Sequence, residues 1–364
     1  MDPRIRQHAE IIADHSVGIN EGDTVLIDAH PAARDLVIAL YEVIGDRGAH
    51  PLRITSRTDK TARRAYLLAH DGEFETAPHE LALTEETDVY IVIKGAPNVT
   101  AEADVDPDIQ SAYSLAHQPI RDERISNTRW VLTQYPATGE AQLAGMSTAE
   151  YENFVWDAIT KDWEEQRAFQ ASMVERLNDA DEVRIQSGEH TDVVLSVAGN
   201  PTRNDFAQHN LPGGEIFTAP IPDSVEGTVL FDKPLYHQSR EITNAYLEFE
   251  DGVVVDHRAD QNEAVLTEAL NADAGARRLG ELGIGMNRDI DQFTYNMLFD
   301  EKMGDTIHLA LGRAYGDTVG AGNEQNESAV HLDMIVDMST DASITLDGEV
   351  VQRDGRFFFE DGFV

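Results

Sequence analysis

The chain has 364 residues, of which 41% are hydrophobic, enough for a large core and more typical of two domains than of one. Its formal charge of -39 argues against nucleic acids and anionic membranes as partners. It contains no cysteine, which excludes a disulfide framework, a thiolate zinc site and a cysteine nucleophile, so any metal must be bound by His, Asp, Glu or water.

The composition also indicates where the protein works. Acidic residues are scattered over the whole chain and only five residues are lysine, a pattern typical of halophilic proteins that stay soluble in concentrated salt. No run of about 18 apolar residues could cross a membrane. The N-terminus lacks the basic-then-apolar layout of a secretion signal. We therefore expect a soluble, cytoplasmic protein.

Strands and helices alternate in the first part of the chain. Apolar residues at helical spacing predict helices, and short β-branched runs predict strands. In chain order we expect a helix over 4–15, a strand over 22–28, a helix over 36–48, a strand over 52–55, a helix over 58–70, and strands over 88–94 and 129–135. This alternation predicts an α/β domain over residues 1–180 with a largely parallel, doubly wound sheet. No glycine-rich dinucleotide motif follows the first strand and no P-loop occurs, so we reject nucleotide binding.

The pattern changes near residue 180. Residues 147–178 are predicted to be helical, and Trp156 and Trp163 within them are expected to pack in the core. From Glu182 onward short alternating strands follow one another, divided by turns such as Asp251-Gly252 and Asp347-Gly348. We therefore expect a second domain, of the α+β class, over residues 181–364.

Two histidines interrupt β-prone runs of this second domain. His308 lies in Thr306-Ile-His308-Leu-Ala-Leu-Gly312, and His331 is followed two residues later by Asp333. Side chains two residues apart in a strand point to the same side, so His331 and Asp333 have a spacing that suits metal ligands. Neutral imidazole and carboxylate oxygens are groups that Zn, Co and Mn bind.

Two glutamates have a sequence context that goes with these histidines. Glu215 follows Asn210-Leu-Pro-Gly-Gly, where the glycines allow a close approach of the backbone, and Glu281 opens the small-residue strand Gly280-Glu281-Leu-Gly-Ile-Gly285. A charge in such a strand is seldom buried without a partner or a metal. Taken singly, each of these residues also has a plain structural explanation. Together they are enough for two ions that share a bridging carboxylate, the candidate ligands being Glu215, Glu281, His308, His331 and Asp333.

Two adjacent divalent ions suit a hydrolytic reaction. They would lower the pKa of a bridging water, polarise the scissile carbonyl and hold the free amine of a substrate, while a glutamate takes and returns the proton. Tyr315 follows His308 by seven residues and could donate a hydrogen bond to the oxyanion of the tetrahedral intermediate. Two alternatives stay open: a dinuclear hydrolase that acts on another amide or on a phosphate ester, and a catalytically inactive metal-binding protein.

The C-terminal motifs, in this order, resemble those of the thermophilic-type metalloaminopeptidases, which are the aminopeptidase T family or peptidase family M29. The matching segments are 210–220, 280–285, 299–312 and 328–333, and the opening strand with its following helix is also similar. The resemblance implies a homodimeric exopeptidase that removes N-terminal residues from peptides with two divalent ions, usually Co, Zn or Mg. It also implies an active-site tyrosine at Tyr315 and metal ligands at Glu215, Glu281, His308, His331 and Asp333.

Two further carboxylates lie close to His308 in the sequence. Glu301 precedes it by seven residues, and we interpret Glu301 as structural or as a residue that supports a ligand, in preference to a ligand itself. Asp305 stands where the family has a small residue. Either it belongs to the general acidification of the chain, or it contacts the second ring nitrogen of His308 and tunes that ligand.

Overall fold

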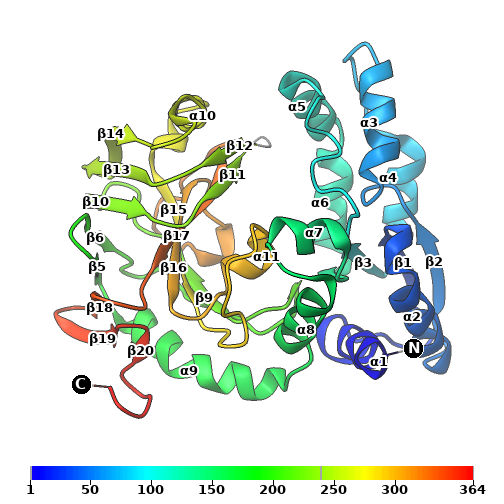
Figure 1. Cartoon of the computed structure of the whole chain (residues 1–364), viewed down its shortest axis with the longest axis horizontal. Helices are drawn as coiled ribbons and strands as arrows, with labels where there is room; N and C mark the ends of the chain where they lie inside the picture. The colour runs from blue at the N-terminus through cyan, green and yellow to red at the C-terminus, as the bar shows by residue number, and fades with distance from the viewer. Residues whose placement is uncertain (1, 238–239, 364) are drawn as a thin grey trace. The chain divides into compact units, whose positions relative to one another are not determined.

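The computed structural model describes residues 2–237 and 240–363, which form two compact units (Figure 1). The first unit runs to Lys161 and also includes Ala207–Gly213; the second contains Asp162–Phe206 and the chain from Gly214 onward. The boundary expected near residue 180 differs from this division in two ways. The helix Trp163–Asp179 belongs to the second unit, because its apolar residues enter the core of that unit, and the chain returns briefly to the first unit.

A parallel sheet of five strands organises the first unit. Its strand order is β2-β1-β3-β4-β8, so the chain runs from β1 to one edge and then crosses to the other side of β1. This is the doubly wound arrangement that the sequence predicts. The strands are β1 Thr24–Ala29, β2 His50–Ile54, β3 Val89–Lys94, β4 Arg129–Gln134 and β8 Asn210–Leu211.

Helices connect these strands and pack against the sheet. Leu83 of α4 packs with Leu26 and Tyr90 on one face of the sheet, and α6 lies beside α4. Trp156 of α8 is 2% exposed and makes an edge contact with His8 of α1, so its expected place in the core is confirmed. The helical segments of this unit are α1 Pro3–Glu10, η1 Ile11–Ser16, η2 Pro31–Ala33, α2 Arg34–Asp46, α3 Lys60–Ala69, α4 Pro78–Glu85, α5 Pro107–Ala116, α6 Gln118–Asn127, α7 Thr138–Leu143 and α8 Thr148–Ile159.

Capping residues explain where several helices begin. Asp2 accepts a hydrogen bond from the backbone N–H of Arg4 directly before α1, whose first residue is proline. Ser147 and Glu150 form a capping box at the start of α8. Among the described residues, none of the helices is both long enough and apolar enough to span a bilayer.

Antiparallel sheets of eight and five strands share one hydrophobic core in the second unit. Val183 and Ile185 on β5 enter this core while their neighbours face outward, which is the period of two expected for these strands. The larger sheet contains β14 Val253–Arg258, β13 Ala245–Glu250, β10 Glu226–Phe231, β6 Thr191–Ser196, β5 Glu182–Ser187, β18 Ala342–Leu346, β19 Glu349–Arg353 and β20 Arg356–Phe357. A ribbon of β11 Leu235–His237 and β12 Arg240–Ile242 lies in the same unit.

The smaller sheet of the second unit has the strand order β17-β16-β15-β9-β7. These strands are β7 Arg203–Asp205, β9 Glu215–Thr218, β15 Leu279–Gly285, β16 Thr306–Gly312 and β17 His331–Asp337. The helical segments of the unit are α9 Trp163–Asp179, α10 Glu263–Leu270, η3 Gly275–Arg277, α11 Met297–Asp300 and η4 Gly316–Thr318.

The two faces of this smaller sheet carry different side chains. In β15, Leu282 and Ile284 enter the hydrophobic core, so Glu281 and Gly283, which alternate with them, point to the opposite face. His308 has the same orientation in β16, because its neighbours on both sides belong to the core. The alternation therefore gathers the polar side chains of neighbouring strands on one face.

Candidate metal centre

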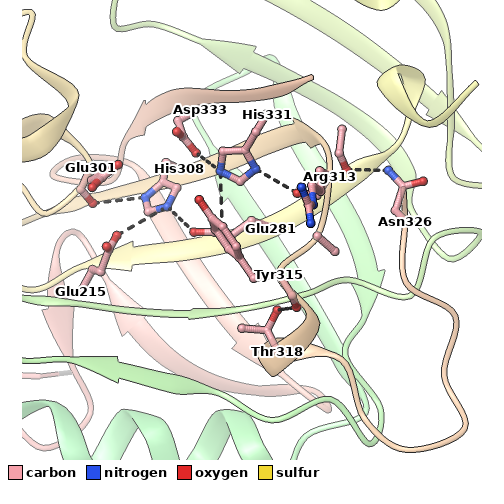
Figure 2. A network of polar contacts seen from close by, with 12 residues as sticks. Glu215, Glu281, Glu301, His308, Arg313, Tyr315, Thr318, Asn326, His331 and Asp333 are labelled. Atoms are coloured by element: carbon pink, nitrogen blue, oxygen red, sulfur yellow. Dashed lines mark hydrogen bonds and ion pairs between the residues drawn. The ribbon is translucent and has the colours of Figure 1, made fainter. Parts of the chain in front are cut away.

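The five predicted ligands come from four adjacent strands of the smaller sheet. Glu215 begins β9, Glu281 lies in β15, His308 in β16, and His331 and Asp333 in β17. Figure 2 shows their side chains pointing toward one another. The register places Ala310 of β16 directly between Glu281 and Asp333, so that only a methyl group separates the two acidic positions across the sheet.

The distances between these side chains match those of ligands that share an ion. The Nε2 atom of His308 is 3.1 Å from Oε1 of Glu281 and 3.6 Å from Oε2 of Glu215. The Nε2 atom of His331 is 3.8 Å from Oε2 of Glu281 and 3.4 Å from Oδ1 of Asp333. Ligand atoms of one tetrahedral ion lie roughly 3.4 Å apart when the bonds are about 2.1 Å. Glu281 thus presents one oxygen to each histidine, as a bridging carboxylate does.

Both histidines are held in the tautomer that a metal ligand needs. The Nδ1–H of His308 donates to the backbone carbonyl of Glu301 at 3.1 Å, and that of His331 donates to the carbonyl of Arg313 at 2.9 Å. In a neutral imidazole the proton then sits on Nδ1, and Nε2 keeps its lone pair facing the carboxylates. Each imidazole is therefore oriented from behind by the backbone.

A glycine makes room for the ring of His308. Gly283 lies opposite His308 in the register of β15 and β16, and a Cβ atom at position 283 would come within 1.9 Å of Cε1 of that ring. No side chain fits there without displacing the histidine. Glycine at position 283 of this strand is therefore needed to leave space for the imidazole, which the sequence alone does not reveal.

The two glutamates of the centre are buried, and some of their oxygens lack hydrogen-bond donors. Glu215 is 4% and Glu281 is 5% exposed, and one carboxylate oxygen of each receives no hydrogen bond from the described residues. Burial raises the pKa of Glu281, and it raises that of Glu215 to about 8. Buried oxygens that lack a donor are expected where a cation binds, so the residues present fit a divalent metal.

The carboxylates of the cluster favour the charged form of both imidazoles. Burial alone would lower the pKa of His308, but the hydrogen bond to Glu281 and the charges of Glu215 and Glu281 outweigh it and raise the pKa to about 10. Burial would also lower the pKa of His331, but the hydrogen bond and the charge of Asp333 outweigh it and raise the pKa to about 9. A metal ion would replace protons on both rings.

Tyr315 lies at the rim of the cluster. Its ring centroid is 4.9 Å from that of His331, and 47% of the residue is exposed. Partial burial and the charges of Glu281 and Asp333 raise the pKa of Tyr315, so the phenol keeps its proton and can act as a hydrogen-bond donor. The position suits the predicted contact with an oxyanion, a role that stays a prediction.

Glu301 and Asp305, which precede His308 in the sequence, differ in what they contact. Glu301 supplies the carbonyl that holds His308, while its carboxylate lies against Lys302. Asp305 pairs with Arg288, and the ring nitrogen that Asp305 could have tuned is bonded to Glu301 instead, so that hypothesis is wrong. Asp305 adopts a left-handed conformation with φ of 63°, which glycine, asparagine and aspartate adopt more readily than other residues.

Lys302 is a residue of the cluster to which the sequence analysis assigned no role. It is completely buried, and Nζ is 3.0 Å from Oε1 of Glu215. One signal was available in the sequence. Only five lysines occur in the chain, and this one directly follows two acidic residues, Asp300 and Glu301, in the segment that leads to His308.

A buried group of three carboxylates and two Nδ1-anchored imidazoles is the donor set of a divalent-metal protein with nitrogen and oxygen ligands. The similarity to known proteins covers nearly the whole chain. Residues 1–362 match the family described as thermophilic metalloprotease (M29). Aminopeptidase AmpS of Bacillus subtilis (strain 168) is 27% identical, with 98% of each chain covered. Aminopeptidase T of Thermus aquaticus is 27% identical over 90% of this chain and 91% of its own.

A solved structure has the same fold. Wild-type AmpT from Thermus thermophilus superposes with a TM-score of 0.87 at 25% identity, over 98% of this chain and 99% of that chain. The chain belongs to the M29 family of metalloproteases. The predicted family and the predicted combination of a parallel α/β sheet with antiparallel sheets are both confirmed.

Proposed function

We propose that this protein is an aminopeptidase that removes N-terminal residues from peptides with two divalent ions. The observation that carries the proposal is the position of Glu281, whose two oxygens face His308 and His331 separately. The relatives named above are aminopeptidases, and the family is one of metalloproteases. A carboxylate whose two oxygens face different histidines suits a bridge between two ions.

The proposed roles of the residues follow from their positions. Glu215 and His308 would hold one ion, His331 and Asp333 would hold the other, and Glu281 would be shared between them. Bound ions of this kind activate a water molecule and polarise the carbonyl of the scissile bond. The phenolic O–H of Tyr315 donates a hydrogen bond to the oxygen of that carbonyl as negative charge develops there.

The proton balance involves the buried glutamates. The attacking water would lose a proton to Glu215 or Glu281, whichever keeps an oxygen free of the ions, as its own oxygen bonds to the carbonyl carbon. The same carboxylate returns that proton to the leaving amine when the C–N bond breaks. The products are a free amino acid and a peptide shortened by one residue.

The identity of the ions and the setting of the enzyme complete the proposal. Mixed carboxylate and imidazole ligands accommodate Zn, Co, Mn or Mg. The formal charge of -39 supports an enzyme adapted to concentrated salt. The family resemblance found in the sequence supports a cytoplasmic homodimer. Sedimentation in high and low salt would test whether the protein is a dimer.

The function is tested with a leucine peptide offered in two forms. We expect release of free leucine from the unblocked peptide and none from its N-acetylated form, because the proposed reaction needs the free amine. Equal cleavage of both forms would indicate another amidase. Hydrolysis of a phosphodiester but of neither peptide would indicate a phosphoesterase, and no hydrolysis with any of the four metals would indicate an inactive metal-binding protein.

A further inference from the structure

Lys302 lies at the centre of a cluster of carboxylates in the second unit. It is 0% exposed, and its Nζ contacts Oε1 of Glu215 at 3.0 Å, Oε1 of Glu301, and Oδ2 of Asp205 at 3.8 Å. A fully buried lysine is rare unless acidic side chains surround its amino group, as they do here. One amino group thus contacts three acidic side chains, one of which, Glu215, is a proposed metal ligand.

The two oxygens of Glu215 have different surroundings. Oε1 receives the ammonium of Lys302, whereas Oε2 has no hydrogen-bond donor among the described residues and lies 3.6 Å from Nε2 of His308. Lys302 therefore binds one side of the carboxylate and leaves the other side turned toward the imidazole. A carboxylate held in this way is restricted to a monodentate approach to any ion at His308.

The backbone around Lys302 is fixed from both sides. Its N–H donates to the carbonyl of Phe299 at 2.9 Å, and its own carbonyl accepts from the N–H of Asn287 at 3.0 Å. The preceding carbonyl, that of Glu301, accepts from Nδ1 of His308. Two consecutive residues thus hold both groups of one half of the centre: Glu301 fixes the imidazole of His308 and Lys302 fixes the carboxylate of Glu215.

We propose that Lys302 is a positioning residue that orients Glu215 toward His308 and thereby sets the affinity of the ion bound there. This inference rests on the proposed dinuclear centre. In the other half of that centre, neither His331 nor Asp333 has a hydrogen bond or ion pair with Lys302 among the interactions of the described residues, and the charge of Lys302 acts on Asp333 only from a longer distance. The two ions therefore depend on Lys302 to different degrees.

The test measures metal binding rather than activity, by titrating Co²⁺ into the demetallated full-length protein. We expect two binding events for the natural chain. Lys302→Met should weaken one event by about 10- to 100-fold, the usual effect of removing a group that orients a ligand, and should leave the other within about threefold. Glu215→Gln should weaken the same event, which identifies the affected ion.

Two further variants separate positioning from charge and from general stability. Lys302→Arg keeps the charge, but its planar fork grips both oxygens of a carboxylate, so it should also weaken the event that Glu215→Gln affects. Lys233→Met is the matched control. It removes a lysine that pairs with Asp337 at 2.8 Å, four residues and roughly 13 Å along β17 from Asp333, and both events should be unchanged.

The outcomes distinguish this inference from the proposed function. Two unchanged events in Lys302→Met would overturn the positioning role, and so would loss of both events in Lys302→Met and Lys302→Arg, because Lys302 would then support the whole centre. Unchanged binding in Lys302→Arg would show that charge alone matters and would also overturn it. A natural chain that binds no ion would contradict the proposed function itself.

Discussion

His8 and His308 are both completely buried, yet they have opposite electrostatic properties. In the first unit, Nε2 of His8 makes a 2.8 Å hydrogen bond to Oγ1 of Thr133, and burial lowers its pKa to about 3. In the second unit, His308 faces carboxylates that raise its pKa to about 10 despite the same burial. Burial alone makes a histidine neutral, whereas burial among carboxylates keeps it charged.

The acidic residues show the same contrast. Asp28 and Glu140 are buried in the first unit, and each accepts a hydrogen bond from a nearby backbone N–H. In the second unit Glu215, Glu281 and Asp333 gather around two histidines instead. The first unit keeps these two buried carboxylates apart, each with a backbone N–H donor, while the second unit gathers several carboxylates in one cluster, where a cation is needed to balance their charge.

The largest expected effect comes from Glu281. Glu281→Gln removes the charge that both histidines face, so we expect peptide hydrolysis to fall by at least about 100-fold together with metal content. Glu140→Gln is the matched change in the first unit, where an amide oxygen can still accept from Ala96. That variant should keep full activity, and comparable losses in both variants would erase the contrast between the units.

A pair of tyrosines gives the next test. Tyr315→Phe should lower kcat by about 100- to 1,000-fold, the effect typical of losing an oxyanion donor, with little change in KM. Tyr90→Phe removes a buried hydroxyl of the first unit that has no hydrogen-bond partner among the described residues, and its activity should be normal. Normal turnover by Tyr315→Phe would remove Tyr315 from the mechanism.

The pH dependence of stability should show the neutral state of His8. Its pKa is about 3 in the folded chain, against 6.5 for an ordinary solvent-exposed imidazole, so between these values the unfolded chain binds the extra proton. The contribution is full above about pH 6.5 and is lost as the pH falls toward 3, by about 1.4 kcal/mol per pH unit. Urea unfolding of the natural chain and of His8→Gln, compared at pH 7 and pH 5, measures it. A stability difference that does not depend on pH would show that His8 is charged in the fold.

Salt should have the smallest effect, and it should not distinguish the two units. Acidic residues cover both, and raising the ionic strength from 0.01 to 1 M shortens the screening length from about 30 to about 3 Å. We expect the melting temperature and the activity to rise with salt. A protein that is equally stable at low and multimolar salt would contradict adaptation to concentrated salt.

The fold could be predicted where the hydrophobic pattern was strong. β1, β3 and β4 lie in continuous apolar runs, and the strands of the larger antiparallel sheet alternate clearly. Helix α5 was not among the predicted elements, and it has no fully buried residue, so its apolar spacing carries little signal. The strand β8 has only two residues, and its pairing with β4 depends on a contact across some 80 positions that no local pattern reveals.

The candidate site was predictable residue by residue but not as a geometry. The ligand candidates could be named because each lies in a recognisable motif. The position of Glu281 between the two histidines depends on the pairing register of the strands. The ion pair of Lys302 with Glu215 joins residues far apart in the sequence. The expectation for Asp305 failed for a related reason: a left-handed turn directs its side chain to Arg288 and away from His308.

The most direct test of the dinuclear centre is elemental analysis of the purified protein, with leucine-peptide hydrolysis followed in the same sample before and after chelation and metal return. The proposed centre predicts two divalent ions per chain, with activity lost on their removal and restored on their return. Hydrolysis that persists after all metal has been removed would contradict the dinuclear mechanism.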